Sequence, residues 1–137
     1  MANFIYGKAK EALFNGEFDI SSNSFGILLL NTSNYTPQQN VHQFVSDIPE
    51  SAIKKNYHPV QNLTNTLGTI DADDVTISDY SGQAFNAIVF YQVGATASQS
   101  RLLFYIDNSP GIPFAGTSTN APVTIIWNND QNKIISL

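Results

Sequence analysis

Short apolar runs, separated by turn-forming polar residues, recur along most of the chain. Each run has the length of a β-strand, and several alternate apolar with polar positions as a half-buried strand does. The segments between them are rich in Gly, Pro, Asn, Asp and Ser, which favour turns. The runs predicted to be strands are residues 24–30, 62–70, 75–78, 85–91, 102–106, 123–127 and 133–137.

A helical pattern is clear only near the start of the chain, at about residues 4–15. Phe4, Ala9, Ala12 and Leu13 lie on or near one stripe of such a helix, with charged residues on the other side. Asn15-Gly16 is a typical helix end. Two roles fit this helix: packing on its own domain, or docking on a neighbouring subunit.

The order of these elements favours an antiparallel sheet. A doubly wound α/β fold needs crossover helices between strands, and the gaps here lack that pattern. We therefore predict one domain over residues 1–137, a mainly-β, antiparallel two-layer β-sandwich with one N-terminal α-helix. Residues 31–43 and 49–59 are predicted to be loops, and 44–48 a short helix or an irregular anchor. The last two strands are predicted to form a hairpin across residues 128–132.

Several strands carry large apolar side chains on both faces. Phe90 is followed by Tyr91, and Phe104 by Tyr105, so aromatic rings point both ways from each strand. Such a sheet needs either cover on both faces from its own chain or a partner subunit on one face. Trp127, the only tryptophan, is predicted to be core, with a ligand platform as the alternative. The predicted core comprises Leu28, Leu30, Val89, Phe104, Ile125 and Trp127.

Composition narrows the possible functions. Charged residues make up 12% of the chain, about half the usual share, while Asn, Gln, Ser and Thr fill roughly a third of the positions. The net charge is −5, with six basic residues and no long basic run, which argues against nucleic-acid binding. The N-terminal residues do not resemble a signal peptide, and no apolar run is long enough to cross a membrane.

Candidate catalytic chemistry is sparse. The chain has no cysteine, and its two histidines, His42 and His58, lie outside any metal-binding or catalytic motif. Gly7-Lys8 lacks the upstream spacing of a phosphate-binding loop. We therefore predict no catalytic residue, no cofactor and no enzymatic activity.

The one acidic cluster, Asp71, Asp73 and Asp74, is a weak candidate for a Ca²⁺ site. It lacks the glycine and the closing glutamate of an EF-hand loop. On a strand, Asp71 and Asp73 would share a face while Asp74 points to the other. Turn or strand-edge structure is the favoured interpretation, so no metal is predicted.

Several blocks of the sequence are distinctive by their order and spacing, although each block by itself is unspecific. They are residues 10–20, 25–30, 35–37, 42–48, 71–76, 87–91, 102–107 and 123–128. Taken in order, these blocks resemble a family of small structural proteins of tailed phages and prophages, of the head-decoration or minor virion type, and the resemblance covers nearly the whole chain. One departure is the stretch 128–132 before Lys133, where the family often has a glycine.

The resemblance implies a non-enzymatic virion component, made in the host cytoplasm. We expect a capsid decoration or cement protein on the capsid surface, in contact with the major capsid protein or neighbouring virion proteins. On the virion it is expected to be a homo-oligomer, with no nucleic acid or membrane as partner. A tail, baseplate or fibre-associated protein that binds a host or a glycan is the alternative, and a small hydrolase ranks lowest.

Overall fold

The computed structural model describes residues 3–17, 24–80, 84–108, 112, 114, 121–127 and 135–136. These residues form antiparallel sheets with one α-helix, which confirms the predicted mainly-β fold. The helix is α1, Gly7–Phe14, and four 3₁₀ helices are η1 (Thr32–Asn34), η2 (Val45–Asp47), η3 (Glu50–Ala52) and η4 (Ala97–Gln99). The strands are β1 (Phe4–Ile5), β2 (Phe25–Leu30), β3 (Ile53–Pro59), β4 (Thr64–Thr66), β5 (Thr69–Asp71), β6 (Val75–Tyr80), β7 (Ala87–Gln92), β8 (Arg101–Ile106), β9 (Ala121–Ile125) and β10 (Ile135–Ser136).

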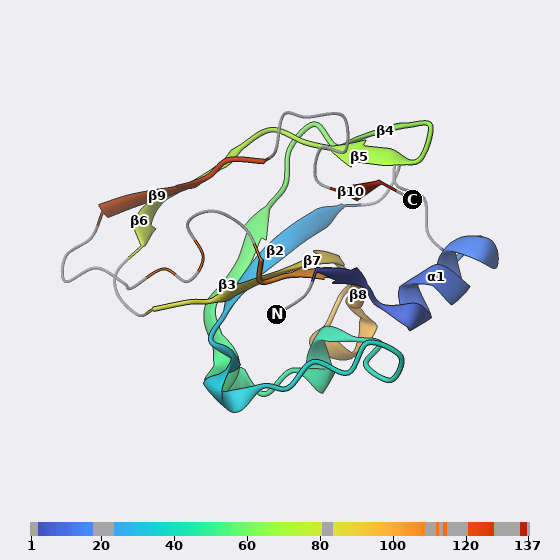
Figure 1. Ribbon diagram of the computed structural model, residues 1–137, viewed down its shortest axis with the longest axis horizontal. Helices are drawn as coiled ribbons and strands as arrows, with labels where there is room; N and C mark the ends of the chain where they lie inside the picture. Colours follow the sequence, from blue (N-terminus) through green and yellow to red (C-terminus); the bar gives the residue numbers. More distant parts are fainter. Residues whose placement is uncertain are drawn as a thin grey trace.

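The central sheet has five strands in the order β1-β8-β7-β2-β3 (Figure 1). Its inner strands are apolar on both faces, because residues directly opposite each other share a face and successive residues alternate. Both rows of side chains are buried. One row is Ile27, Phe90 and Phe104, and the opposite row is Leu28, Val89 and Tyr105.

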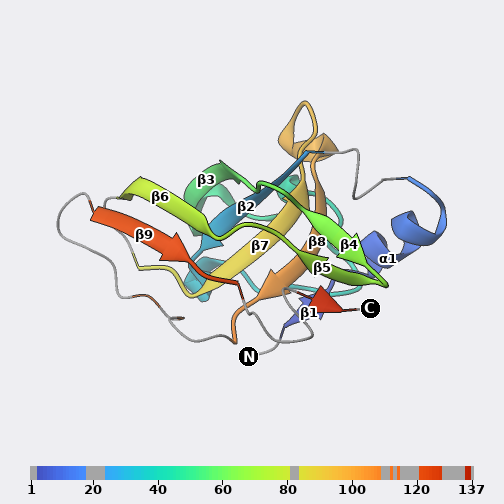
Figure 2. The same cartoon turned by 90° about the horizontal axis from the view of Figure 1, so that it is seen from above.

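Other parts of the same chain cover both faces. Two small sheets, β6-β9 and β10-β5-β4, lie over one face, and the segment with η1 to η3 lies under the other (Figures 1 and 2). Helix α1 packs beside β8 at one end of the sheet. The second β-layer therefore consists of two small sheets, and no partner subunit is required to cover the aromatic rings of the central strands.

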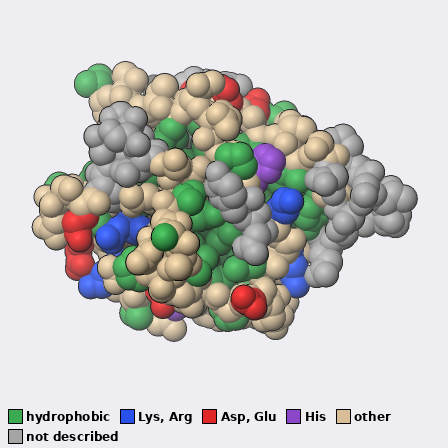
Figure 3. Space-filling model, turned by 180° about the vertical axis from the view of Figure 1, so that it is seen from behind, with side chains coloured by type: hydrophobic (Ala, Val, Ile, Leu, Met, Phe, Trp, Pro, Cys, Tyr) green, Lys and Arg blue, Asp and Glu red, His purple; other side chains and the backbone are tan. Residues whose placement is uncertain are grey.

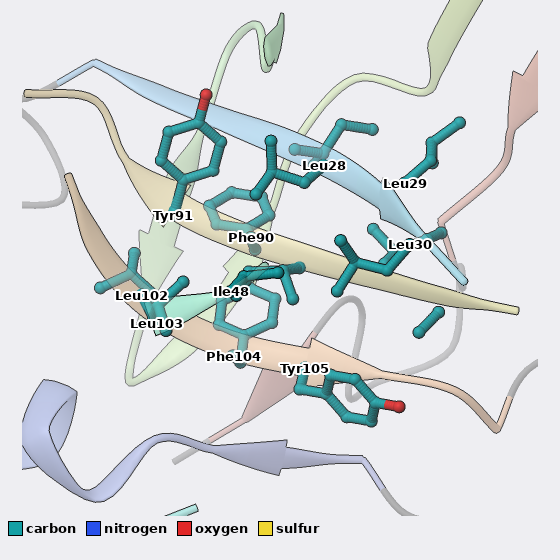
Figure 4. Close-up of a cluster of buried hydrophobic side chains, with 14 of the residues drawn as sticks. Leu28, Leu29, Leu30, Ile48, Phe90, Tyr91, Leu102, Leu103, Phe104 and Tyr105 are labelled. Carbon is teal, nitrogen blue, oxygen red and sulfur yellow. The ribbon is translucent and has the colours of Figure 1, made fainter. Parts of the chain in front are cut away.

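Most of the predicted core positions lie inside. Leu28, Leu30, Val89, Phe104 and Trp127 are buried, whereas Ile125 is half-buried against the core. The rings of Phe90 and Phe104 stack with their centroids 4.5 Å apart, and both are seen at the centre of Figure 4. Trp127 meets Phe90 edge-on at 6.4 Å, which joins the second layer to the central sheet.

The predicted start of the helix is wrong. Phe4 and Ile5 form strand β1 opposite Tyr105 and Phe104, and the helix begins only at Gly7. Pairing with β8 overrides the helical spacing because Phe4 stacks on Tyr105 at 5.0 Å. The helix end was predicted correctly: Gly16 has a φ of +71°, and the Glu17 N–H donates to the Ala12 carbonyl.

Three strand predictions also need correction. Residues 53–59, predicted as a loop, form the edge strand β3, which pairs with β2. Residues 62–70 contain the two-residue turn Leu67-Gly68 between β4 and β5 instead of one strand. The predicted hairpin across residues 128–132 lies outside the described residues, and the described residues of its two strands pair elsewhere: β9 with β6, and β10 with β5. These pairings join residues far apart in sequence, which local patterns do not reveal.

The connection from β7 to β8 is held by a buried serine. The Gly94 N–H donates to the Ser100 hydroxyl at 3.0 Å, and that hydroxyl donates to the Thr96 carbonyl at 2.9 Å. The Ser100 carbonyl in turn accepts the Val45 N–H, so this turn anchors the start of η2. A β-carbon on Gly94 would overlap the Gln99 carbonyl oxygen, so only glycine fits.

Gly94→Ala is therefore expected to lower the free energy of unfolding by about 1–3 kcal/mol, the usual range for overpacking against a fixed neighbour. Urea denaturation monitored by circular dichroism measures this change. Ser98→Ala, at an exposed position in the same connection, is the control and is expected to stay within about 0.5 kcal/mol of the parent. Equal stability of Gly94→Ala and the parent would contradict the close approach.

Candidate functional site

The acidic cluster is part of the packing around Trp127. The Trp127 indole Nε1–H donates to the Asp73 carbonyl at 2.9 Å, and its backbone N–H donates to Asp74 Oδ1 at 2.9 Å. Asp73 Oδ2 accepts the Asn62 side-chain amide at 2.6 Å. Asp71 ends β5, and Asp73 and Asp74 lie in the link to β6. The Asp73 carbonyl and the Asp74 carboxylate therefore hold Trp127, just after β9, against the link between β5 and β6.

Within the part of the chain that the structure describes, no three His, Cys, Asp or Glu side chains are grouped so that they could hold a metal ion. His58 lies on β3 opposite Ile27, and His42 lies in the segment before η2. Among the same residues, no helix is long and apolar enough to cross a membrane.

A chain of hydrogen bonds joins the start of α1 to the segment below the central sheet. The Tyr6 and Tyr35 hydroxyl oxygens are 3.1 Å apart, and the Tyr35 hydroxyl lies 2.8 Å from His42 Nδ1. The Gln38 N–H also donates to His42 Nδ1, at 3.3 Å, so this nitrogen is an acceptor. The Tyr35 hydroxyl therefore donates to His42 and accepts from Tyr6.

The two tyrosine hydroxyls in this hydrogen-bonded series are neutral. Burial raises the pKa of Tyr6 far above its ordinary value, and burial also raises the pKa of Tyr35. Both hydroxyls therefore stay protonated and neutral at physiological pH, and neither is a nucleophile or a base. This series of hydrogen bonds connects the start of α1 to the segment below the central sheet. Pattern analysis did not single out Tyr6 and Tyr35, because residues 29 positions apart meet only in the folded chain.

Asp47 accepts backbone hydrogen bonds at the start of η2, in the same segment below the central sheet. Its Oδ2 accepts the N–H groups of Gln43 and Phe44 at 2.8 and 3.0 Å. Desolvation, the largest single influence, raises the pKa of Asp47, but the two N–H donors oppose it, and the pKa of this carboxyl lies below its usual range. Stability from Asp47 is therefore present above about pH 4 and is lost as the pH falls through the lower folded-state pKa.

Large apolar side chains outside the core are the remaining candidates for function. Because the chain covers both faces of its own sheet, the aromatic core residues are not available to a partner. Charged side chains do not form a patch on the face shown in Figure 3, where acidic and basic groups lie scattered among apolar and neutral polar ones. Among the described residues, the exposed large apolar ones are Leu13, Phe14, Val41, Leu67 and Ile126.

Leu67 and Phe14 are the most exposed of these residues, at 98% and 89% of their full accessible area. Neither was predicted as a functional residue. Phe14 lies within the predicted helix 4–15, and Leu67 lies within the predicted strand 62–70. Only the turn geometry of the folded hairpin brings Leu67 into solvent.

A scan against protein-family models found no matching family, and a search of curated proteins found no matching relative.

Trp127 connects the segment after β9 to the central sheet through its buried ring. Trp127→Ala is expected to lower the free energy of unfolding by about 3–5 kcal/mol, because it removes a buried ring and its hydrogen bond to Asp73. Trp127→Phe keeps an aromatic ring and is expected to lose less. Denaturant titration of both variants measures the difference. A Trp127→Ala variant that melts with the parent would favour the ligand-platform alternative instead.

The hydrogen bond between the Tyr6 and Tyr35 hydroxyls can be tested by removing each hydroxyl. Tyr35→Phe leaves the Tyr6 hydroxyl buried without its acceptor, so a loss of about 1–3 kcal/mol is expected. Combining Tyr6→Phe with Tyr35→Phe removes both hydroxyls, and the double variant is expected to lose less than the sum of the single losses. A double-mutant cycle from urea denaturation tests this, and strictly additive losses would show that the hydroxyls do not interact.

Proposed function

We propose that this protein is a non-enzymatic structural component of a tailed-phage virion that attaches to the assembled capsid as a decoration protein. The observation that carries the proposal is the contrast between a core closed within one chain and two large apolar side chains, Leu67 and Phe14, that lie almost wholly in solvent. Such residues do not stabilise the isolated chain, whereas they contribute free energy when a partner buries them.

The surface chemistry supports a protein partner. Nucleic-acid phosphates would require a basic surface, and the chain carries six basic residues and a net charge of −5. Neutral side chains that form hydrogen bonds can fix how two protein surfaces align, and such contacts depend little on salt. The resemblance to phage structural proteins, carried by the ordered blocks of sequence, supports a virion as the setting.

The small exposed apolar area supports a lattice as the partner. A few exposed side chains give a weak contact per copy, but many copies on a symmetric shell attach together through multivalency. The proposed partner is therefore the major capsid protein lattice or a neighbouring virion protein, with homo-oligomers formed on the capsid surface.

Purified protein added to capsids that lack it is expected to bind saturably, in a fixed ratio to the major capsid protein. Binding is expected to persist at about 1 M salt, where the screening length falls to about 3 Å, because few ion pairs are expected in the contact. Co-sedimentation at about 0.1 M and about 1 M salt measures both properties.

Isolated tails are the parallel sample in this experiment. Binding only to tails, or to host cells and their glycans, would reject the capsid proposal in favour of a tail, baseplate or fibre-associated role. Binding to capsids that disappears at moderate salt would retain the location but contradict the mechanism, because charge steering would then be the main contribution.

A further inference from the structure

The β4–β5 turn presents a leucine in an unusual conformation. Thr66 pairs with Thr69, so Leu67 and Gly68 are the two central residues of a tight hairpin. Their φ values are +53° and +83°, as a type I′ turn requires. Glycine adopts positive φ at no cost, and Asn tolerates it, but a branched apolar side chain does not favour it.

The leucine brings no benefit to the folded chain. Its side chain is 98% exposed, so it makes almost no packing contact. The turn itself would form better with Asn at this position, since Asn-Gly is the preferred pair for type I′. A residue that is unfavourable in its turn and unpacked in the fold is explained most simply by a contact outside the chain.

The residues next to this leucine in the sequence are uncharged. Thr64, Asn65 and Thr66 on β4 are all exposed, and Asn65 Oδ1 accepts the Gly68 N–H within the turn. The segment 61–70 carries no charged residue. An anionic membrane surface would attract basic residues, so this tip is better suited to a neutral protein surface.

Phe14 lies at the same end of the molecule. The last turn of α1 and the β4–β5 turn project at one end of the long axis, as both ribbon views show (Figures 1 and 2). Phe14 is the last residue of α1 and is 89% exposed. Two exposed large apolar residues thus belong to elements at the same end of the molecule, and one of them has neutral threonines and an asparagine next to it in the sequence.

We propose that this end of the molecule is the capsid-binding surface, with Leu67 entering an apolar socket of the capsid lattice and Phe14 contacting its rim. This inference rests on the proposed function. A second copy of the chain is a poor occupant, because two side chains provide far less than the roughly 800 Å² per partner of a stable dimer. A lattice accepts such a small contact because it is repeated at many sites.

Leu67→Asn separates a binding role from a structural one. It converts the turn to Asn-Gly, so the melting temperature is expected to stay equal or rise. Affinity for capsids is expected to fall about tenfold or more, because burial of one leucine contributes on that scale. Leu67→Gly is expected to behave like Leu67→Asn, whereas Leu67→Met keeps an apolar side chain and is expected to retain binding.

Val41→Asn is the matched control. Val41 is 63% exposed, and its segment lies on the other side of the central sheet from the hairpin (Figure 1). The Val41→Asn variant is expected to bind capsids with the affinity of the parent, while the Phe14→Ser variant is expected to lose part of that affinity. Titration of each labelled variant onto capsids that lack the protein gives the dissociation constants.

The two proposals fail differently in this experiment. Capsids that do not bind the parent protein would overturn the proposed function. Parent-like binding by Leu67→Asn and Leu67→Gly would overturn the role of this end and leave the proposed function standing. A loss of binding by Val41→Asn equal to that of Leu67→Asn would also overturn it, because the effect would then not be local to the hairpin.

Discussion

Burial of the central strands on both faces is the constraint on which the rest of the structure depends. β2 is buried at every position and β7 at all but its last. A sheet with this pattern exposes a large apolar surface until both faces are covered. The chain meets this demand with small sheets on one face and an irregular, 3₁₀-rich segment on the other.

Polar contacts at a few points hold these covers in place. On one face, Asp73 and Asp74 fix Trp127, whose ring reaches the central sheet at Phe90. On the other face, Tyr6, Tyr35 and His42 connect α1 to the covering segment. Polar contacts of this kind favour one arrangement, because a polar group that becomes buried must keep its partner. Asp73, Asp74 and His42, which the sequence offered as candidates for chemistry, thus take part in holding the covers in place.

A core closed in this way places any binding chemistry at the periphery. Side chains that face the core are already in use, so a partner can gain free energy only from turns, helix ends and exposed loops. Leu67 and Phe14 occupy such positions, at one end of the molecule. With few charges on the chain, binding there would depend on apolar contact and neutral hydrogen bonds.

The sequence by itself determined the class of fold and its inner strands. Bounded apolar runs located β2, β7 and β8 because central strands must be apolar throughout, and Asn15-Gly16 located the helix end through backbone preference. Only the tertiary structure decided which segments form the edge strands and which strands they pair with. β3 carries lysines and a histidine and was predicted as a loop, since an edge strand is stabilised by its neighbour and not by its own pattern. The partners of β9 and β10 lie far away in sequence, and Leu67 is exposed because of a turn that pairing with β5 creates. Local patterns report how a segment is buried, whereas pairing between distant segments decides which segment buries it and what is left in solvent.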